Sequence, residues 1–316
     1  MGLFGKTKNN FGWLAISCQS DGIFVAHVKK PPSSKPVVEL FSFYPADKPG
    51  YPAALNKLAK ELHPDRYQCT HLLKSGEYQL LSVDAPNVPP DELKNAIRWS
   101  IKDMLDYHVD DATIDVLAVP LDKDGPARSN TLFAVAARNQ VIGQRQALFE
   151  GAKIALCAID IPEMAQRNIS ALLEPEGRAI ALLSFNAEGG LITITFGGEL
   201  YFSRRIDMTV TQLQQADVSH KTALHERITL ELQRSLDHFD RQYHAMPLSK
   251  LLLSPMGLEG AGLQEYLAAN LYTPVETLHL ESILDFSKAP DLNNVESQQR
   301  YFMVLGAALR HEEKSL

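Results

Sequence analysis

The sequence has few cysteines, no long apolar run and no excess of basic residues, and each absence excludes a class of protein. Its three cysteines are far apart and odd in number, which excludes a disulfide framework and a CxxC zinc site. Every apolar stretch falls short of the roughly 18 residues that cross a bilayer, and the start lacks the apolar segment of a secretory signal. The formal charge of -7, with scattered lysines and arginines, argues against nucleic acid as a ligand. We therefore expect a protein of a reducing, cytoplasmic compartment.

What the chain does contain is enough apolar residues, 45% of 316, to build the cores of two or more subdomains. Strands over 13–28 and 37–43, followed by a helix over 51–62, form a first predicted unit. Strands over 179–186, 191–196 and 200–206 are followed by an amphipathic helix over 221–244. The second unit echoes the first, which indicates two related halves.

Between these units the pattern predicts a compact α/β insert. Apolar runs within 71–83 precede a proline-rich stretch and the clearest helix, over 91–107, whose apolar residues recur at helical spacing. Strands over 113–119 and 132–137 and a helix over 140–150 follow. Beyond the second unit we expect a strand over 250–253, a helix over 263–271 and a largely buried closing helix over 298–310.

A series of short segments runs through nearly the whole chain. In order they are VDAPNVPPDEL at 83–93, AIRW at 96–99, FAVAAR at 133–138, GAKI at 151–154, AIDIP at 158–162, GELYFSR at 198–204 and LGAALR at 305–310. Together they resemble PilM-type pilus assembly proteins, and most of all the branch that serves mannose-sensitive haemagglutinin (MSHA) pili. Each segment alone is weakly specific, and the order and spacing carry the resemblance.

The resemblance implies an α/β protein with the actin-like ATPase fold, in which two RNase H-like halves carry an insert of the kind found in PilM and FtsA. The expected division is residues 1–82 for the first half, 83–155 for the insert, 156–178 for the return to the first half, 179–290 for the second half with a helical part near 215–245, and 291–316 for a closing helix that packs back on the first half.

Actin-like ATPases hold Mg-ATP with an aspartate-bearing turn in each hairpin and a glycine-rich turn, and here these signals are degraded. By resemblance, the first aspartate falls at Ala15 and the second at Ser184, with Asn186 and Glu188 in place of glycines. A missing carboxylate leaves Mg²⁺ without its usual anchor. We expect no catalytic residue, and at most a vestigial site for ATP and Mg²⁺, made of Ser17, Ser184, Asn186, Gly189, Gly257 and Gly260. For Gly257 and Gly260 a plain tight turn between a strand and a helix is the favoured explanation, and nucleotide contact is the alternative.

The family's known behaviour implies that function lies in binding other proteins. A groove beside the insert would capture the cytoplasmic tail of a PilN-like inner-membrane protein, with Val83, Pro86, Arg98 and Trp99 as contacts. Core packing explains Trp99 equally well. The pilus motor ATPase and a second copy of the chain are further candidate partners. The protein would then be cytoplasmic and held at the inner membrane by its partners.

Two alternatives stay open. The chain would be an ATP-binding switch or weak ATPase of the same machine if other residues compensate for the replaced ones. A component of type II secretion similar to GspL would carry a membrane helix and a periplasmic domain after the actin-like part, and the charged end at 311–315 argues against it. The histidines His225, His238 and His244 lack the spacing of a metal site. At the strand end, Ser203, Arg204 and Arg205 could meet a phosphate or a carboxylate, and we favour a solvated strand edge guarded by charge.

Overall fold

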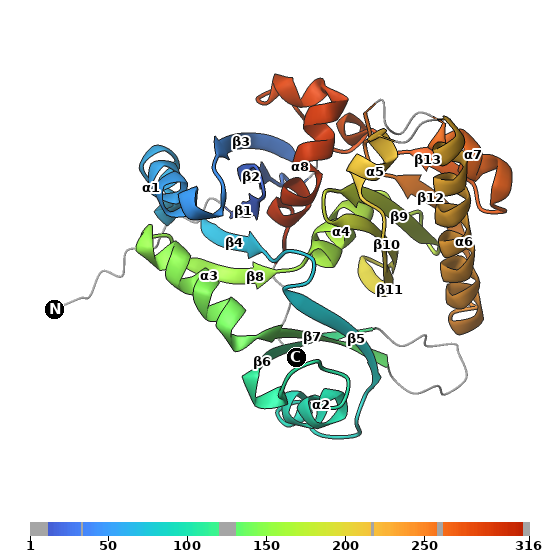
Figure 1. Ribbon diagram of the computed structural model, residues 1–316, viewed down its shortest axis with the longest axis horizontal. Helices are drawn as coiled ribbons and strands as arrows, with labels where there is room; N and C mark the ends of the chain where they lie inside the picture. Colours follow the sequence, from blue (N-terminus) through green and yellow to red (C-terminus); the bar gives the residue numbers. More distant parts are fainter. Residues whose placement is uncertain (1–11, 33, 120–130, 216–217, 258–261, 312–316) are drawn as a thin grey trace.

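Two five-stranded sheets with the same strand order form the frame of the molecule (Figure 1). The computed structural model describes residues 12–32, 34–119, 131–215, 218–257 and 262–311. The first sheet has the order β3-β2-β1-β4-β8, made of β3 (Val37–Pro45), β2 (Gly22–Lys29), β1 (Trp13–Gln19), β4 (Gln68–Leu72) and β8 (Leu156–Asp160). The second has the order β11-β10-β9-β12-β13, made of β11 (Glu199–Ile206), β10 (Gly189–Phe196), β9 (Ala179–Asn186), β12 (Leu248–Leu253) and β13 (Val275–Thr277). This repetition confirms the prediction of two related halves.

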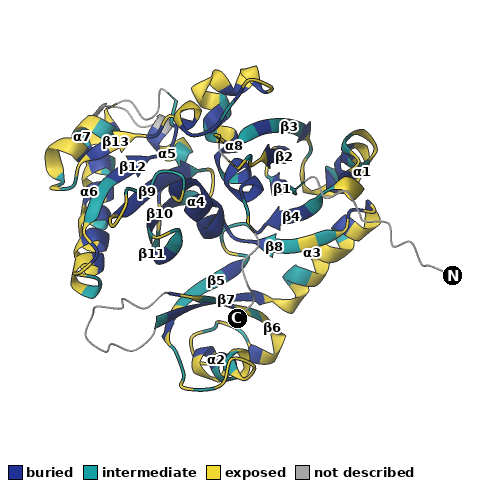
Figure 2. Cartoon of the chain, turned by 180° about the vertical axis from the view of Figure 1, so that it is seen from behind, coloured by how far each residue is buried: buried dark blue, intermediate teal, exposed yellow. Residues whose placement is uncertain are grey.

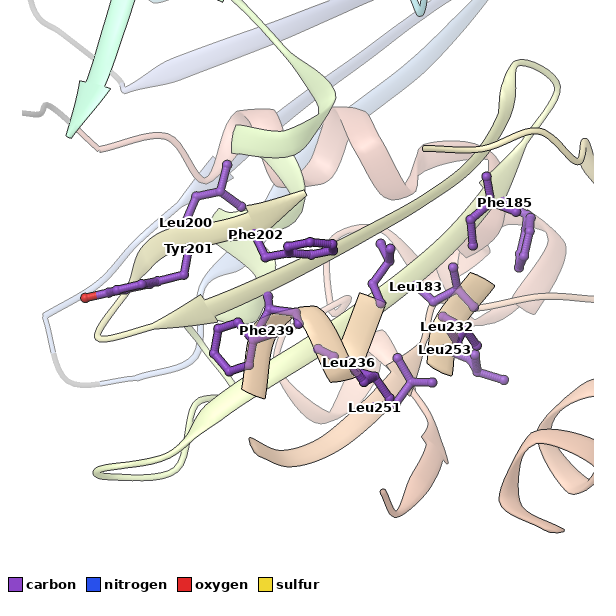
Figure 3. Close-up of a cluster of buried hydrophobic side chains, with 14 of the residues drawn as sticks. Leu183, Phe185, Leu200, Tyr201, Phe202, Leu232, Leu236, Phe239, Leu251 and Leu253 are labelled. Carbon is purple, nitrogen blue, oxygen red and sulfur yellow. The ribbon is translucent and has the colours of Figure 1, made fainter. Parts of the chain in front are cut away.

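Helices cover the outer face of each sheet. On the first sheet, α1 (Tyr51–Leu62) and α3 (Asn139–Gly151) enclose a core that includes Leu14, Ile16 and Phe149. On the second, α6 (Val218–Gln242) and α7 (Leu263–Asn270) do the same, after the short helix α5 (Val210–Gln215). Figure 3 shows Leu232, Leu236 and Phe239 of α6 pointing at the strands, as the predicted apolar stripe requires.

Two helices form a central layer between the sheets (Figure 1). They are α4 (Pro162–Ser170) and α8 (Val295–Ala308), and they share a core with side chains from β1, β2, β9 and β12. Every residue of α4 is buried. At the crossing, a Cβ on Gly306 would lie 2.2 Å from the carbonyl oxygen of Ala165, so only glycine allows this approach. The closing helix α8 packs on α4 and also on β1 and β2 of the first sheet.

The insert is a third sheet with one helix on it. Its order is β5-β7-β6, from β5 (Tyr78–Asp84), β7 (Thr131–Arg138) and β6 (Ala112–Ala118), and α2 (Leu93–Ile101) packs on one face. The prediction of a helix up to residue 107 is wrong. The Arg98 guanidinium donates hydrogen bonds to the carbonyl oxygens of Val109 and Ala112, at 3.0 and 3.3 Å, and folds the chain back after Ile101.

The remaining expected strands and helices are present at bounds within a few residues of the prediction. Sequence patterns missed β8, α4 and β13. The short 3₁₀ helices are η1 (Lys48–Gly50), η2 (Pro64–Arg66), η3 (Val109–Asp111), η5 (Leu280–Ser282) and η6 (Pro290–Asn293). None of the helices in the described part of the chain has both the length and the apolar character to cross a membrane.

Candidate functional site

The first turns of the two halves are equivalent residue by residue. Gln19 ends β1 opposite Gly22, and Asn186 ends β9 opposite Gly189. Two residues earlier stand Ser17 and Ser184, so the strand register makes Ser17, and not Ala15, the counterpart of Ser184. Ala15 and Leu182 both belong to the central core, and alternation along a strand therefore turns Ser17 and Ser184 toward that same layer.

Ser184 is tied into a buried network on α4. Its hydroxyl donates a hydrogen bond to Oε1 of Gln166 at 2.8 Å. The Gln166 amide nitrogen in turn donates to the carbonyl oxygens of Leu182 and Leu191 and to the Thr193 hydroxyl. Because Gln166 is fully buried, these bonds form away from water, where an unpaired amide would be costly. The position expected to carry an aspartate thus holds a neutral group that is part of the core.

Two side chains of the second turn, Asn186 and Glu188, accept hydrogen bonds that hold the turn in place. The Asn186 carboxamide oxygen accepts a hydrogen bond from the Glu188 amide at 2.8 Å. The Glu188 carboxylate accepts one from the amide of Ser75, in the β4–β5 connection, at 2.7 Å. Gly189 has a φ of +132°, a conformation that favours glycine. A carboxylate at this turn would repel a phosphate group.

The third turn makes contact with α8. The amide of Gly257 donates a hydrogen bond to the side-chain oxygen of Gln299 at 3.2 Å. The neighbouring Arg300 pairs with Asp21 of the first hairpin at 2.7 Å and lies over the ring of Phe43 at 4.7 Å. The beginning of α8 thereby links the first and third turns. The candidate residue Gly260 lies outside the described residues.

The described residues offer few ligands for a metal ion. In the ranges given above, no group of three or more His, Cys, Asp or Glu side chains is placed to hold one. At the ends of β1 and β9, Ser17 and Ser184 offer hydroxyl oxygens, and the one on Ser184 is already hydrogen-bonded to Gln166. Neither position offers a carboxylate, the ligand that Mg²⁺ prefers.

A polar cluster that sequence patterns missed joins three parts of the molecule. The buried Glu163 carboxylate, in the first turn of α4, accepts hydrogen bonds from the Tyr78 hydroxyl of β5 and from the Arg205 guanidinium of β11, the latter at 3.0 Å. Burial, and then the Glu163 charge, raise the pKa of Tyr78. For Arg205 the favoured interpretation as a solvated strand edge is wrong and the alternative of a carboxylate contact is confirmed, because its guanidinium contacts both Tyr78 and Glu163. In the sequence, the one local sign of this cluster is the acidic Glu163 directly after Pro162, where a helix can begin.

The four candidate partner contacts are not brought into one exposed surface. Val83 is buried in the core of the insert, Arg98 is bonded within it, and Pro86 is half-buried. Trp99 is 68% exposed, so the core-packing interpretation of this residue is wrong. A large aromatic side chain on the solvent side of a helix marks a contact surface more often than a scattered small apolar residue does.

No protein-family model and no curated protein sequence matches this chain. Solved structures do resemble it. A chain of the PilM-PilN type IV pilus biogenesis complex is similar with a TM-score of 0.72 at 18% identity, over 95% of this chain and 98% of that one. A Bacteroides thetaiotaomicron protein with an actin-like ATPase fold and unknown function is similar with a TM-score of 0.50 at 11% identity, over 90% and 96% of the two chains. The cytoplasmic domain of EpsL, from the type II secretion system of Vibrio cholerae, follows with a TM-score of 0.46 at 15% identity, over 83% and 96%.

These likenesses agree with the strand orders of the two halves. The two related halves had been expected from the resemblance of short segments, and the chain of the PilM-PilN complex is similar over nearly the full length of both chains. The chain has the actin-like ATPase fold, in the form found in the PilM-PilN complex.

Proposed function

We propose that the protein is a scaffold or adaptor of a type IV pilus assembly machine that binds the cytoplasmic tail of a PilN-like inner-membrane protein. The observation that supports this most is the likeness to a chain of the PilM-PilN complex over almost all of both chains. Segment resemblance favours an MSHA-type pilus, with MshI as the nearest named protein. The partner would then be of the MshJ type. The protein would work in the cytoplasm, at the inner membrane.

The nucleotide site of this adaptor is degenerate. Ser17 and Ser184 replace the carboxylates that organise Mg²⁺, and Ser184 is committed to Gln166. Glu188 places a negative charge at the second turn, where it would oppose a phosphate. The protein therefore acts by holding partners, and any ATP bound near Gly257 would not be hydrolysed efficiently. Contacts with the motor ATPase or with further copies belong to the same scaffold role.

Calorimetry on the full chain tests the proposal with two ligands. Titration with Mg-ATP is expected to give no signal, whereas a synthetic peptide of the candidate partner's cytoplasmic tail is expected to bind. A scrambled tail peptide of the same composition is the control. Binding of Mg-ATP at micromolar concentration, about -8 kcal/mol, would instead support an ATP-dependent switch. Equal binding of the tail and its scrambled form would overturn the adaptor role.

A further inference from the structure

The insert is attached to the first half through two connections that lie side by side. The chain enters the insert through residues 73–77, between β4 and β5, and leaves it where β7 continues at Asn139 into α3. Tyr78, the first residue of β5, pairs with Ala137 near the end of β7, so entry and exit meet at one end of the insert. Gly76 in the entry connection has a φ of +81°, and a Cβ there would meet nothing within 4 Å. The covalent links alone would therefore let the insert turn about this end.

The insert has a hydrophobic core of its own, so it can turn without unfolding. The buried members of this core come from α2 and from all three strands: Val83, Ile97, Ile101, Val116, Leu132, Ala134 and Ala136. The opposite face of the insert sheet is covered less completely. Phe133 is buried in the core that includes the second sheet, whereas Leu80, Leu117 and Val135 are half-buried beside it. Apolar packing alone therefore holds the insert incompletely against the second half.

Polar contacts from α4 and from the second half hold the insert at its inner end. The Tyr78 hydroxyl donates a hydrogen bond to Glu163 of α4 and accepts one from Arg205 of β11, whose guanidinium lies 5.3 Å from the centre of the tyrosine ring. Three residues earlier, the Ser75 amide donates to the carboxylate of Glu188, in the turn between β9 and β10, at 2.7 Å. Figure 1 shows β5 starting near the middle of the molecule and running outward, and Figure 2 shows this beginning as buried. The polar contacts thus act where the insert would turn.

The burial of Glu163 makes these hydrogen bonds depend on one another. Glu163 is 1% exposed, whereas the Arg205 side chain is 38% exposed and reaches the carboxylate from the surface at 3.0 Å. A carboxylate at this depth is costly without partners, so the guanidinium and the Tyr78 hydroxyl are held close to it. Movement of the insert alone would take the hydroxyl away from a buried charge. The position of Tyr78 is therefore tied to the positions of α4 and β11.

We propose that Tyr78, Glu163 and Arg205 form a latch that fixes the orientation of the insert relative to the second half. The latch is closed in this structure, and when its hydrogen bonds to Tyr78 break, the insert turns as a folded unit about its inner end. A ligand that turns the insert must break the latch, and a change at β11 that withdraws Arg205 frees the insert. The insert and the second half are thus coupled although they belong to separate sheets. This inference does not depend on the adaptor role.

Hydrogen-deuterium exchange of the full chain tests the latch. Tyr78→Phe removes the hydroxyl and keeps the ring, and it is expected to speed exchange in residues 73–78, which include the Ser75 amide, about tenfold. Exchange in the centre of β7, at 133–136, should stay unchanged, because the insert keeps its own core. Tyr107→Phe is the matched control in the same insert. The Tyr107 hydroxyl has no hydrogen-bond partner among the described residues, so its loss should change neither segment.

Double electron-electron resonance measures the orientation itself. One spin label is placed at Lys102→Cys, after α2, and the other at Asp240→Cys, on α6, both exposed positions, in a Cys157→Ser background that removes the exposed native thiol. The distribution of label distances should be narrow with the latch intact. It should broaden in the double variant Glu163→Gln with Arg205→Met, which opens the latch without leaving a buried charge unpaired.

Arg204→Met is the matched control for this measurement. Arg204 lies on the same strand as Arg205 and is similarly exposed, but it pairs with Glu231 of α6 at 3.8 Å, within the second half. Its loss should leave the label distances narrow. Unchanged exchange in Tyr78→Phe together with unchanged distances in the double variant would overturn the latch. Faster exchange at 133–136 as well as at 73–78 would also overturn it, because the insert would then unfold instead of turning.

Discussion

Ser184 on β9 donates a hydrogen bond to Gln166 on α4, and this one contact joins the second sheet to the central layer at the place where an actin-like ATPase is expected to have a carboxylate. With Ser184 only 3% exposed and Gln166 fully buried, the site is built as core. Restoring a single carboxylate should therefore not restore an ATPase.

The Ser184→Asp variant tests this directly. A charge at this buried position would face the Gln166 carbonyl oxygen and lose its hydration, so the free energy of unfolding should fall by about 3 to 5 kcal/mol. No ATP hydrolysis should appear. Urea denaturation and a phosphate-release assay measure the two effects. Ser82→Asp, at an exposed position of β5, should change stability by less than about 1 kcal/mol. Hydrolysis above the blank in Ser184→Asp would contradict the degenerate-site interpretation.

The crossing of α4 and α8 predicts opposite effects for two glycine substitutions. In Gly306→Ala the new methyl group would meet the Ala165 carbonyl oxygen, so the helices must separate, and stability should fall by about 1 to 3 kcal/mol. Gly143→Ala, in α3, meets nothing within 4 Å and should gain about 0.5 to 1 kcal/mol. Thermal denaturation of both variants checks the prediction, and equal shifts in the two proteins would contradict the close approach.

The buried His71 imidazole predicts a loss of stability in acid. Burial is the main cause that lowers the pKa of His71 from 6.5 to about 4, and its Nδ1 is bonded to the Ile16 carbonyl oxygen at 3.0 Å. Between these two values the unfolded chain takes up a proton that the folded chain does not. The free energy of unfolding should therefore fall as the pH drops from about 6.5 to about 4, by about 3 kcal/mol in total.

The His71→Gln variant isolates this contribution. Its free energy of unfolding, measured by urea denaturation at several pH values, should vary less over that window than in the unmodified protein. His63→Asn is the control, because His63 is exposed and has a φ of 49°, which asparagine tolerates. Identical pH profiles for His71→Gln and the unmodified protein would show that His71 does not supply the acid sensitivity.

The contact between Glu163 and Arg205 should show strong coupling in a double-mutant cycle. With Glu163 at 1% exposure and the ion pair at 3.0 Å, Glu163→Gln and Arg205→Met should have a coupling energy of about 1 to 3 kcal/mol. The surface pair Glu231 and Arg234, three residues apart on α6, should give less than about 0.5 kcal/mol. Equal coupling in the two cycles would mean that the buried ion pair does not hold α4 against β11.

Local patterns predicted the parts of the fold in which one face is apolar and the other polar. The helix α1 over Tyr51–Leu62 and the two hairpins are examples, because half-buried elements show their period in the sequence. The helix α4 could not be found in this way. It is buried on all sides, yet it carries Gln166, Arg167 and Asn168, whose partners come from β9, β11 and α8.

In the candidate site, too, some features could be predicted from the sequence and others could not. Replacement of the aspartates was inferred from the residues of each turn and stays a prediction. The sequence pointed to Ala15 in the first turn, whereas the register of β1 with β2 makes Ser17 the counterpart of Ser184. Sequence patterns left two interpretations of Trp99, since a residue beside an apolar stripe can face either way. The exposure of the indole excludes core packing, and partner binding by Trp99 stays a prediction. The role of Arg205 could not be predicted from its own segment, because its partners Tyr78 and Glu163 are distant in the sequence.

The two halves share one strand order, but a single insert interrupts the first of them. A molecule of two equal halves would offer two equivalent docking places and no preferred direction. The insert removes that equivalence, because it belongs to the first half alone. Any surface that the insert forms is therefore present once in each copy of the chain, and a ligand bound there meets the two halves differently.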